Sequence, residues 1–129
     1  MEATISRPQP SRALNIATWV ASALLCALYL FASSGKLMSD PQAVEGFRKV
    51  GYSDGFRLFI GTCELLGGVA LLIPRLAFWA ASGLIIIMFG AVYTHLSQND
   101  AVHMGPAVIA LLLLAFVARL RRGRALFLG

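Results

Sequence analysis

Charged residues are scarce in this chain: Asp, Glu, Lys and Arg make up 13% of its 129 residues, whereas ordinary soluble domains contain ~25%. The hydrophobic share is 58%, and the few charges are unevenly placed. Four apolar segments fill most of the sequence, each close to the ~17–25 residues that cross a bilayer. They are residues 14–36, 57–73, 76–96 and 104–120. The short connections predict one membrane domain with no room for a soluble one.

Several common catalytic patterns are also missing. Cys26 and Cys63 are the only cysteines, and they fall on different apolar segments without C-x-x-C spacing, so small packing residues are the expected role. There is no phosphate-binding glycine loop and no G-x-S-x-G elbow. His95, His103 and Asp100 lack the spacing of a metal site, so none is predicted. No catalytic residue follows from these patterns.

The net charge of +5 does not indicate nucleic acid, because no aromatic residues alternate with a basic stripe. The positive residues instead gather at segment ends, as the positive-inside rule describes. One side of a four-span topology holds Arg7, Arg12, Arg75, Arg119, Arg121, Arg122 and Arg124. The other side holds Lys36, Arg48, Lys49 and Arg57, offset by acidic residues. This asymmetry predicts a multi-pass protein of a plasma (inner) membrane, bacterial in type, with both termini in the cytoplasm.

The predicted fold is all-α: an antiparallel four-helix transmembrane bundle. Residues 1–13 form a polar cytoplasmic arm, 14–120 the membrane domain and 121–129 a basic cytoplasmic tail. The first outer connection predicts a short amphipathic helix, because Asp40-Pro41 has the form of a helix start and Gly51 of a stop. Between them, Val44, Phe47 and Val50 recur every three residues. Ser53 or Asp54 can then cap the second span.

Glu64 is the only acidic side chain inside the apolar segments. A carboxylate in hydrocarbon costs ~2.5–3.5 kcal/mol on insertion scales, so it is expected to face the bundle interior and find a partner. Gly61 and Gly68 share its helix face and either bring a neighbouring helix to the carboxylate or leave a small cavity there. Gly83 and Gly90 have the same spacing on the third segment and predict another close approach.

The expected companions of Glu64 lie in the outer half of the bundle. Lys36 ends the first span and His95 lies near the outer end of the third. His103, Tyr93 and Thr94 are secondary candidates at a similar depth. Such groups around a partly dry cavity can bind a polar head group or relay protons. Each also has a structural alternative, as an interface anchor, a helix-boundary residue or an interhelical hydrogen bond.

The chain resembles the DoxX-like family of small membrane proteins in several stretches, which together cover about residues 14–120. They are Phe31-Ala-Ser-Ser-Gly-Lys-Leu37, Phe47-Arg-Lys-Val-Gly51, the run from Gly61-Thr-Cys-Glu through Pro74-Arg75, and Ala91-Val-Tyr-Thr-His95. The resemblance implies a four-helix integral membrane protein with Lys36, Glu64 and His95 at its characteristic polar positions. It also implies a link to thiosulfate:quinone oxidoreductase and membrane redox complexes. Relatives that do thiol chemistry carry paired cysteines, which this sequence lacks.

The expected function is therefore a redox-associated membrane subunit whose Glu64, Lys36 and His95 pocket takes a quinone or another small amphipathic molecule. No other cofactor is indicated. The alternatives are a non-enzymatic carrier or channel for a small solute and a membrane assembly partner. In a third interpretation the polar residues only hold the helices together. Besides the lipid bilayer, a redox partner or a second copy of the chain is a possible partner.

Overall fold

The computed structural model describes residues 11–99 and 101–125, except for the side chains of residues 101–103. Throughout this part of the chain the regular structure is helical. The elements are α1 (Arg12–Leu37), α2 (Pro41–Lys49), α3 (Asp54–Ala70), α4 (Pro74–Ser97), α5 (Ala101–Arg121) and the 3₁₀ turn η1 (Arg122–Arg124). The all-α prediction is confirmed, and residues 1–10 and 126–129 of the predicted arm and tail lie outside the described residues.

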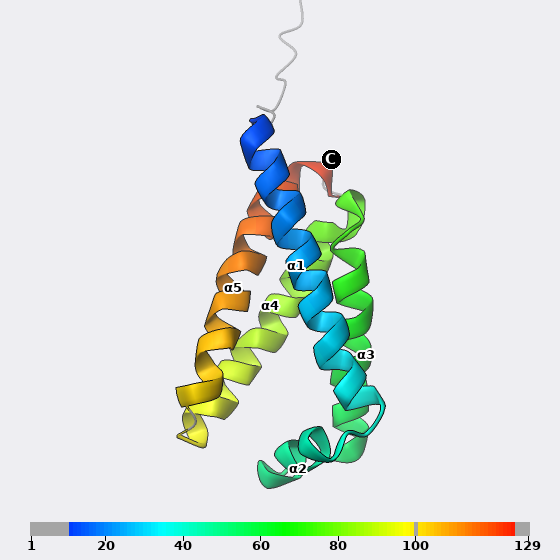
Figure 1. Ribbon diagram of the computed structural model, residues 1–129, viewed down its shortest axis with the longest axis vertical. Coiled ribbons are helices and arrows are strands. Elements are labelled where there is room, and N and C mark those ends of the chain that lie inside the picture. Colours follow the sequence, from blue (N-terminus) through cyan, green and yellow to red (C-terminus); the bar gives the residue numbers. More distant parts are fainter. Residues whose placement is uncertain (1–10, 100, 126–129) are drawn as a thin grey trace, which may run out of the picture.

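The four longer helices run along the long axis of the molecule, with α1 beside α3 and α4 beside α5 (Figure 1). Helix α3 also contacts α4, and α1 also contacts α5, so each long helix packs against two others. The turn between α3 and α4 spans only residues 71–73, which makes these helices antiparallel neighbours. Helix α2 crosses the end of α1 and α3 that lies far from the chain termini (Figure 1).

Small residues let the helices approach in the core. Ala77 and Ala81 of α4 and Ala110 of α5 are fully or almost fully buried, beside larger residues such as Leu84 and Leu114. Close packing of small residues is the usual means of association between helices in a membrane, where lipid tails are as apolar as the helices themselves. Contacts between small side chains therefore hold α4 against α5.

Large apolar side chains cover the outward faces of the same helices. Phe31 is 82% exposed, Ile86 72% and Leu112 66%. A surface this apolar is unfavourable in water and favourable against hydrocarbon. Helices α1 and α4 and the span Met104–Arg124 are long and apolar enough to cross a membrane. Helix α3, at 17 residues, falls just short of that length as a regular helix.

A short helix, α2, occupies the connection between α1 and α3. Asp40 precedes α2 with Pro41 at its start, although the Asp40 side chain makes no capping hydrogen bond. Gly51 ends the segment with φ of 88°, a left-handed conformation that glycine adopts without steric cost. Ser53 caps α3, since its hydroxyl accepts a hydrogen bond from the backbone N–H of Phe56 at 3.1 Å. Val44 and Phe47 are half-buried, whereas Arg48 is exposed.

The start of the last helix differs from the prediction. Helix α5 begins at Ala101, before the expected Met104, so Pro106 lies inside the helix instead of near its first residue. Pro106 lies beyond the first turn, where the missing N–H of a proline would not be needed, so α5 lacks one backbone hydrogen bond at this position.

Candidate functional site

The centre of the site is an ion pair between the last turn of α1 and the middle of α3. Lys36 Nζ donates a hydrogen bond to Glu64 Oε2 at 3.0 Å. The Glu64 side chain is only 4% exposed and that of Lys36 is 18% exposed. The ammonium lies 3.5 Å from the Ala32 carbonyl, a contact at the limit of hydrogen bonding. Glu64 thus faces the interior with Lys36 as its partner, and Lys36 forms the more accessible edge of the pair.

Two glycines fix the distance between the helices on either side of Glu64. A Cβ atom on Gly61 would lie 3.0 Å from the Lys36 Cβ, and one on Gly68 would lie 3.0 Å from the Tyr29 Cβ. Contacts this short are tighter than most real Cβ contacts, so glycine favours this approach, and α1 is the neighbouring helix that the sequence left open. By contrast, a Cβ on Gly83 or Gly90 would meet nothing within 4 Å. The prediction of a second close approach there is wrong, because those glycines point outward from α4.

Arg57 is a buried member of this cluster that the sequence analysis treated only as a span boundary. It is 3% exposed, and its Nη1 donates a hydrogen bond to the Lys36 carbonyl. That carbonyl is one of the last in α1, where the helix itself supplies no N–H partner. Arg57 thereby binds the end of α1 to α3 directly behind the Lys36–Glu64 pair. Arg57 lies two turns before Glu64 on the same helix face, and this position in the sequence could have identified it as a member of the cluster.

The polar contacts continue from Arg57 to the surface through Asp54. Arg57 Nη2 lies 4.0 Å from Asp54 Oδ1, and Arg48 of α2 donates hydrogen bonds to Asp54 at 2.8 and 3.3 Å. The Arg48 guanidinium lowers the pKa of the exposed Asp54 carboxyl, chiefly through these hydrogen bonds. Helix α2 is thus joined by charge to the same end of α3 that holds Arg57.

Tyr29 is a second residue that sequence reasoning missed. It is 2% exposed and lies two turns before Lys36 on the same face of α1. Its hydroxyl is buried without a hydrogen-bond partner in the described part of the chain, and the Glu64 charge acts on it electrostatically. Glu64 therefore lies between Lys36 on one side and Tyr29 on the other. A tyrosine within an apolar run gave no pattern by which to find it.

The other candidates whose side chains are described lie near the end of α4. His95 is half-buried in the last turn of α4, and among the side chains described it is Lys36 that makes the ion pair with Glu64. Tyr93 is 71% exposed. The hydroxyls of Thr94 and Tyr52 lie 3.0 Å apart in a hydrogen bond that ties the segment after α2 to the end of α4. The side chain of His103 lies outside the described residues.

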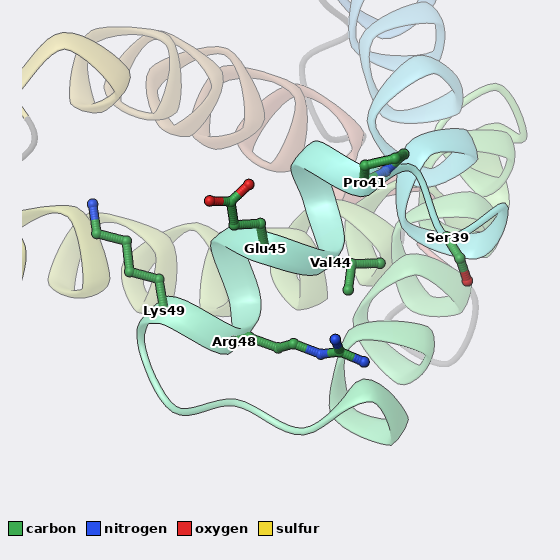
Figure 2. Close-up of a pocket in the computed structure, with 6 residues that line it drawn as sticks. All are labelled: Ser39, Pro41, Val44, Glu45, Arg48 and Lys49. Atoms are coloured by element: carbon green, nitrogen blue, oxygen red, sulfur yellow. The ribbon is translucent and has the colours of Figure 1, made fainter.

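A hollow of about 620 Å³ lies on the surface of α2. It is lined by Ser39, Pro41, Val44, Glu45, Arg48 and Lys49. Figure 2 shows that Arg48 extends from one side of α2 while Glu45 and Lys49 point to the other. None of Lys36, Glu64 and His95 lines this hollow. It is a shallow feature of the α2 surface, separate from the ion pair.

The chemistry available at the pair is proton transfer and charge stabilisation. A buried carboxylate beside an ammonium and a phenol can accept or donate a proton, and the ammonium can stabilise an anion. Among the described residues, no group of three or more His, Cys, Asp and Glu side chains could hold a metal ion. Cys26 and Cys63 are free thiols.

The apolar helices and the buried ion pair define a small helical membrane protein, and comparison of the sequence with known families agrees. The model of the DoxX-like family matches residues 20–117. The chain belongs to this DoxX-like family, as its motifs predict. No match was found among curated proteins, and none was found among solved structures.

Proposed function

We propose that the protein is a four-span antiparallel bundle of the plasma (inner) membrane that serves as a redox-associated subunit. In this proposal a quinone or another small amphipathic molecule binds beside Lys36 and Glu64, with His95 near the same outer end. The observation that carries it is the buried Lys36–Glu64 pair, with the buried and unpartnered Tyr29 hydroxyl on the same helix as Lys36. Buried ionisable groups of this kind in a membrane helix are by default functional.

The residues present fit a quinone-like head group, because they offer both hydrogen-bond donors and a proton acceptor. A bound quinone supplies the capacity to accept electrons and protons from a membrane partner. Lys36, the accessible edge of the pair, orients and stabilises the oxygen that gains negative charge. Glu64 holds the proton that is exchanged at that oxygen, and the packed α1–α3 interface excludes water from the carboxylate.

The test is quinone binding by the purified protein in detergent or nanodiscs. The substitution Glu64→Gln removes the titratable group but keeps its size, and it is expected to lower quinone affinity about tenfold, in the range of a lost charge-assisted hydrogen bond. Asp54→Asn makes the same chemical change at an exposed carboxylate and is expected to leave affinity unchanged. Equal affinities in wild type and Glu64→Gln, or no binding in either, would overturn the proposal.

The close packing around Glu64 favours a second candidate, a non-enzymatic membrane protein in which the pair locks α1 to α3. Such a protein serves as an assembly partner, for a redox complex or a second copy, or as a small-solute carrier. For this candidate Glu64→Gln changes stability but no redox activity. Uptake of a labelled solute into vesicles, abolished by Glu64→Gln, would identify the carrier form of it.

A further inference from the structure

The end of the molecule opposite α2 carries an arginine cluster, defined as Arg119, Arg121, Arg122 and Arg124. The cluster closes α5 and forms η1, which lies beside the turn between α3 and α4 (Figure 1). The acidic residues that the structure describes lie elsewhere: just before α2, on α2, at the start of α3 and in the middle of α3. They are Asp40, Glu45, Asp54 and Glu64. The cluster therefore has no counter-charge among the described residues.

Part of the positive charge of this cluster is buried, because Arg121 is shielded from solvent. Its side chain is 2% exposed, with the guanidinium carbon 4.7 Å from the centre of the Trp19 ring on α1. Its Nε and Nη2 are buried without a hydrogen-bond partner in the described chain, and Arg124 repels it electrostatically. The stacking on Trp19 offsets part of this cost, but a buried guanidinium with unpaired donors still favours a nearby anion.

A second source of positive potential lies next to η1. Helix α4, which η1 contacts, starts at Pro74 and has no side-chain capping hydrogen bond at its N-terminus. The first N–H groups of a helix carry partial positive charge that favours anions. Arg75 is exposed in the same first turn. The N–H groups of Leu76 and Ala77 already bond to the Ile73 carbonyl, so the helix contributes the positive end of its dipole, and this favours the same kind of ligand as the arginine cluster.

We propose that this end of the protein binds the phosphate group of an anionic phospholipid. The cluster lies at the end of the candidate span Met104–Arg124, which is the depth at which headgroup phosphates occur. Arg122 and Arg124 are both exposed and form the contacts with the phosphate, since guanidinium groups match phosphate oxygens in geometry. The bound phosphate supplies the counter-charge that the buried Arg121 lacks. This site is independent of the proposed redox role.

The test measures lipid binding to the full chain in detergent by native mass spectrometry. Phosphatidylglycerol and phosphatidylcholine are compared, because both carry phosphate but only the first is anionic. The variant Arg122→Gln/Arg124→Gln is expected to lose roughly 30-fold in phosphatidylglycerol affinity, from about fivefold for each arginine at a charged surface. The control Arg48→Gln/Lys49→Gln removes equal charge at the opposite end and is expected to keep the wild-type affinity.

The outcomes distinguish lipid binding at the arginine cluster from a general attraction of anionic lipid to the positively charged protein. A phosphatidylglycerol preference that is lost in the first variant and kept in the control supports the proposal. Equal losses in both variants, or no preference in the wild type, would overturn it. A third arm adds inorganic phosphate: displacement of the lipid identifies the phosphate group alone as sufficient, and its persistence identifies the lipid as the required form. Helical content by circular dichroism verifies that both variants fold, as expected for exposed positions.

Discussion

At Glu64, burial and pairing act together, because the carboxylate is almost inaccessible and Lys36 is the cation that meets it at 3.0 Å. Removing one member of a buried pair leaves the other uncompensated, which typically costs several kcal/mol. We expect Lys36→Met to lower the free energy of unfolding by about 3 kcal/mol. Glu64→Gln should cost less, since the Lys36 ammonium can extend towards the polar interface.

The measurement is reversible unfolding in mixed micelles, arranged as a double-mutant cycle. The double variant Lys36→Met/Glu64→Gln should lose less than the sum of the two single losses, because it leaves no unpaired charge. Additive losses would mean that the two side chains do not interact in the folded protein. This outcome bears on the ion pair itself and not on any ligand.

The sequence located Glu64 and Lys36 for a simple physical reason: an ionisable group in an apolar run must be paired, and few partners are available. Arg57 and Tyr29 could not be assigned in the same way. From the sequence, Arg57 is interpreted as a charge at the boundary of a span. Its contact with the end of α1 involves a carbonyl of another helix, so only the structure reveals it. Tyr29 depends on the register between α1 and α3, and no single-helix pattern determines that register.

Helix α3 approaches α1 through its glycines, and this contact should be sensitive to a single methyl group. The substitution Gly68→Ala places a Cβ 3.0 Å from the Tyr29 Cβ, which is backbone-proximal and cannot rotate away. We expect a loss of about 1–3 kcal/mol in unfolding free energy, the usual cost of overpacking. Gly83→Ala is the matched control, since its Cβ meets nothing within 4 Å. It should be neutral or slightly stabilising, because alanine favours helix.

The measurement compares the unfolding free energies of the two alanine variants in the same micelles. Equal stabilities for Gly68→Ala and Gly83→Ala would show that α1 and α3 are not in close contact at Tyr29. The spacing of glycines was identical on α3 and α4, and only the tertiary arrangement distinguishes them. Sequence alone therefore predicted one close approach correctly and the other wrongly.

Helix α2 is attached to α3 by the Arg48–Asp54 pair, and this attachment should depend on pH. The pKa of Asp54 is lowered in the folded protein by Arg48, so the carboxylate contributes stability above its unfolded pKa of about 3.9. That contribution is lost as pH falls through the lower, folded pKa. The protection factors of the α2 amides, which are corrected for the pH dependence of intrinsic exchange, should therefore fall below about pH 4.

The variant Arg48→Gln isolates the effect. Without the guanidinium, the α2 amides should have lower protection factors at neutral pH, and these factors should change little further on acidification. A pH dependence that is the same in wild type and Arg48→Gln would assign it to other groups. The effect is expected to be modest, because both side chains are largely exposed and surface ion pairs contribute little.

For the whole molecule, the number of membrane crossings depends on α3. Its 17 regular helical residues span about 25 Å at 1.5 Å per residue, slightly less than the ~30 Å hydrocarbon core. The apolar residues 71–73 continue beyond its end and extend the segment towards the full thickness. Modest mismatch is accommodated by local thinning of the bilayer. We therefore expect α3 to cross the membrane, which places α2 and the C-terminal turn η1 on opposite sides.

Cysteine labelling in intact cells tests this directly, in a Cys26→Ala/Cys63→Ala background. Gln42→Cys on α2 and Gly123→Cys in η1 replace exposed residues without changing charge. With four crossings and a cytoplasmic C-terminus, a membrane-impermeant maleimide should label Gln42→Cys in whole cells and Gly123→Cys only after lysis. If α3 did not cross, α4 and α5 would be inverted and both cysteines would be labelled from outside. Only the four-crossing arrangement separates the arginine cluster from α2 by the full thickness of the bilayer.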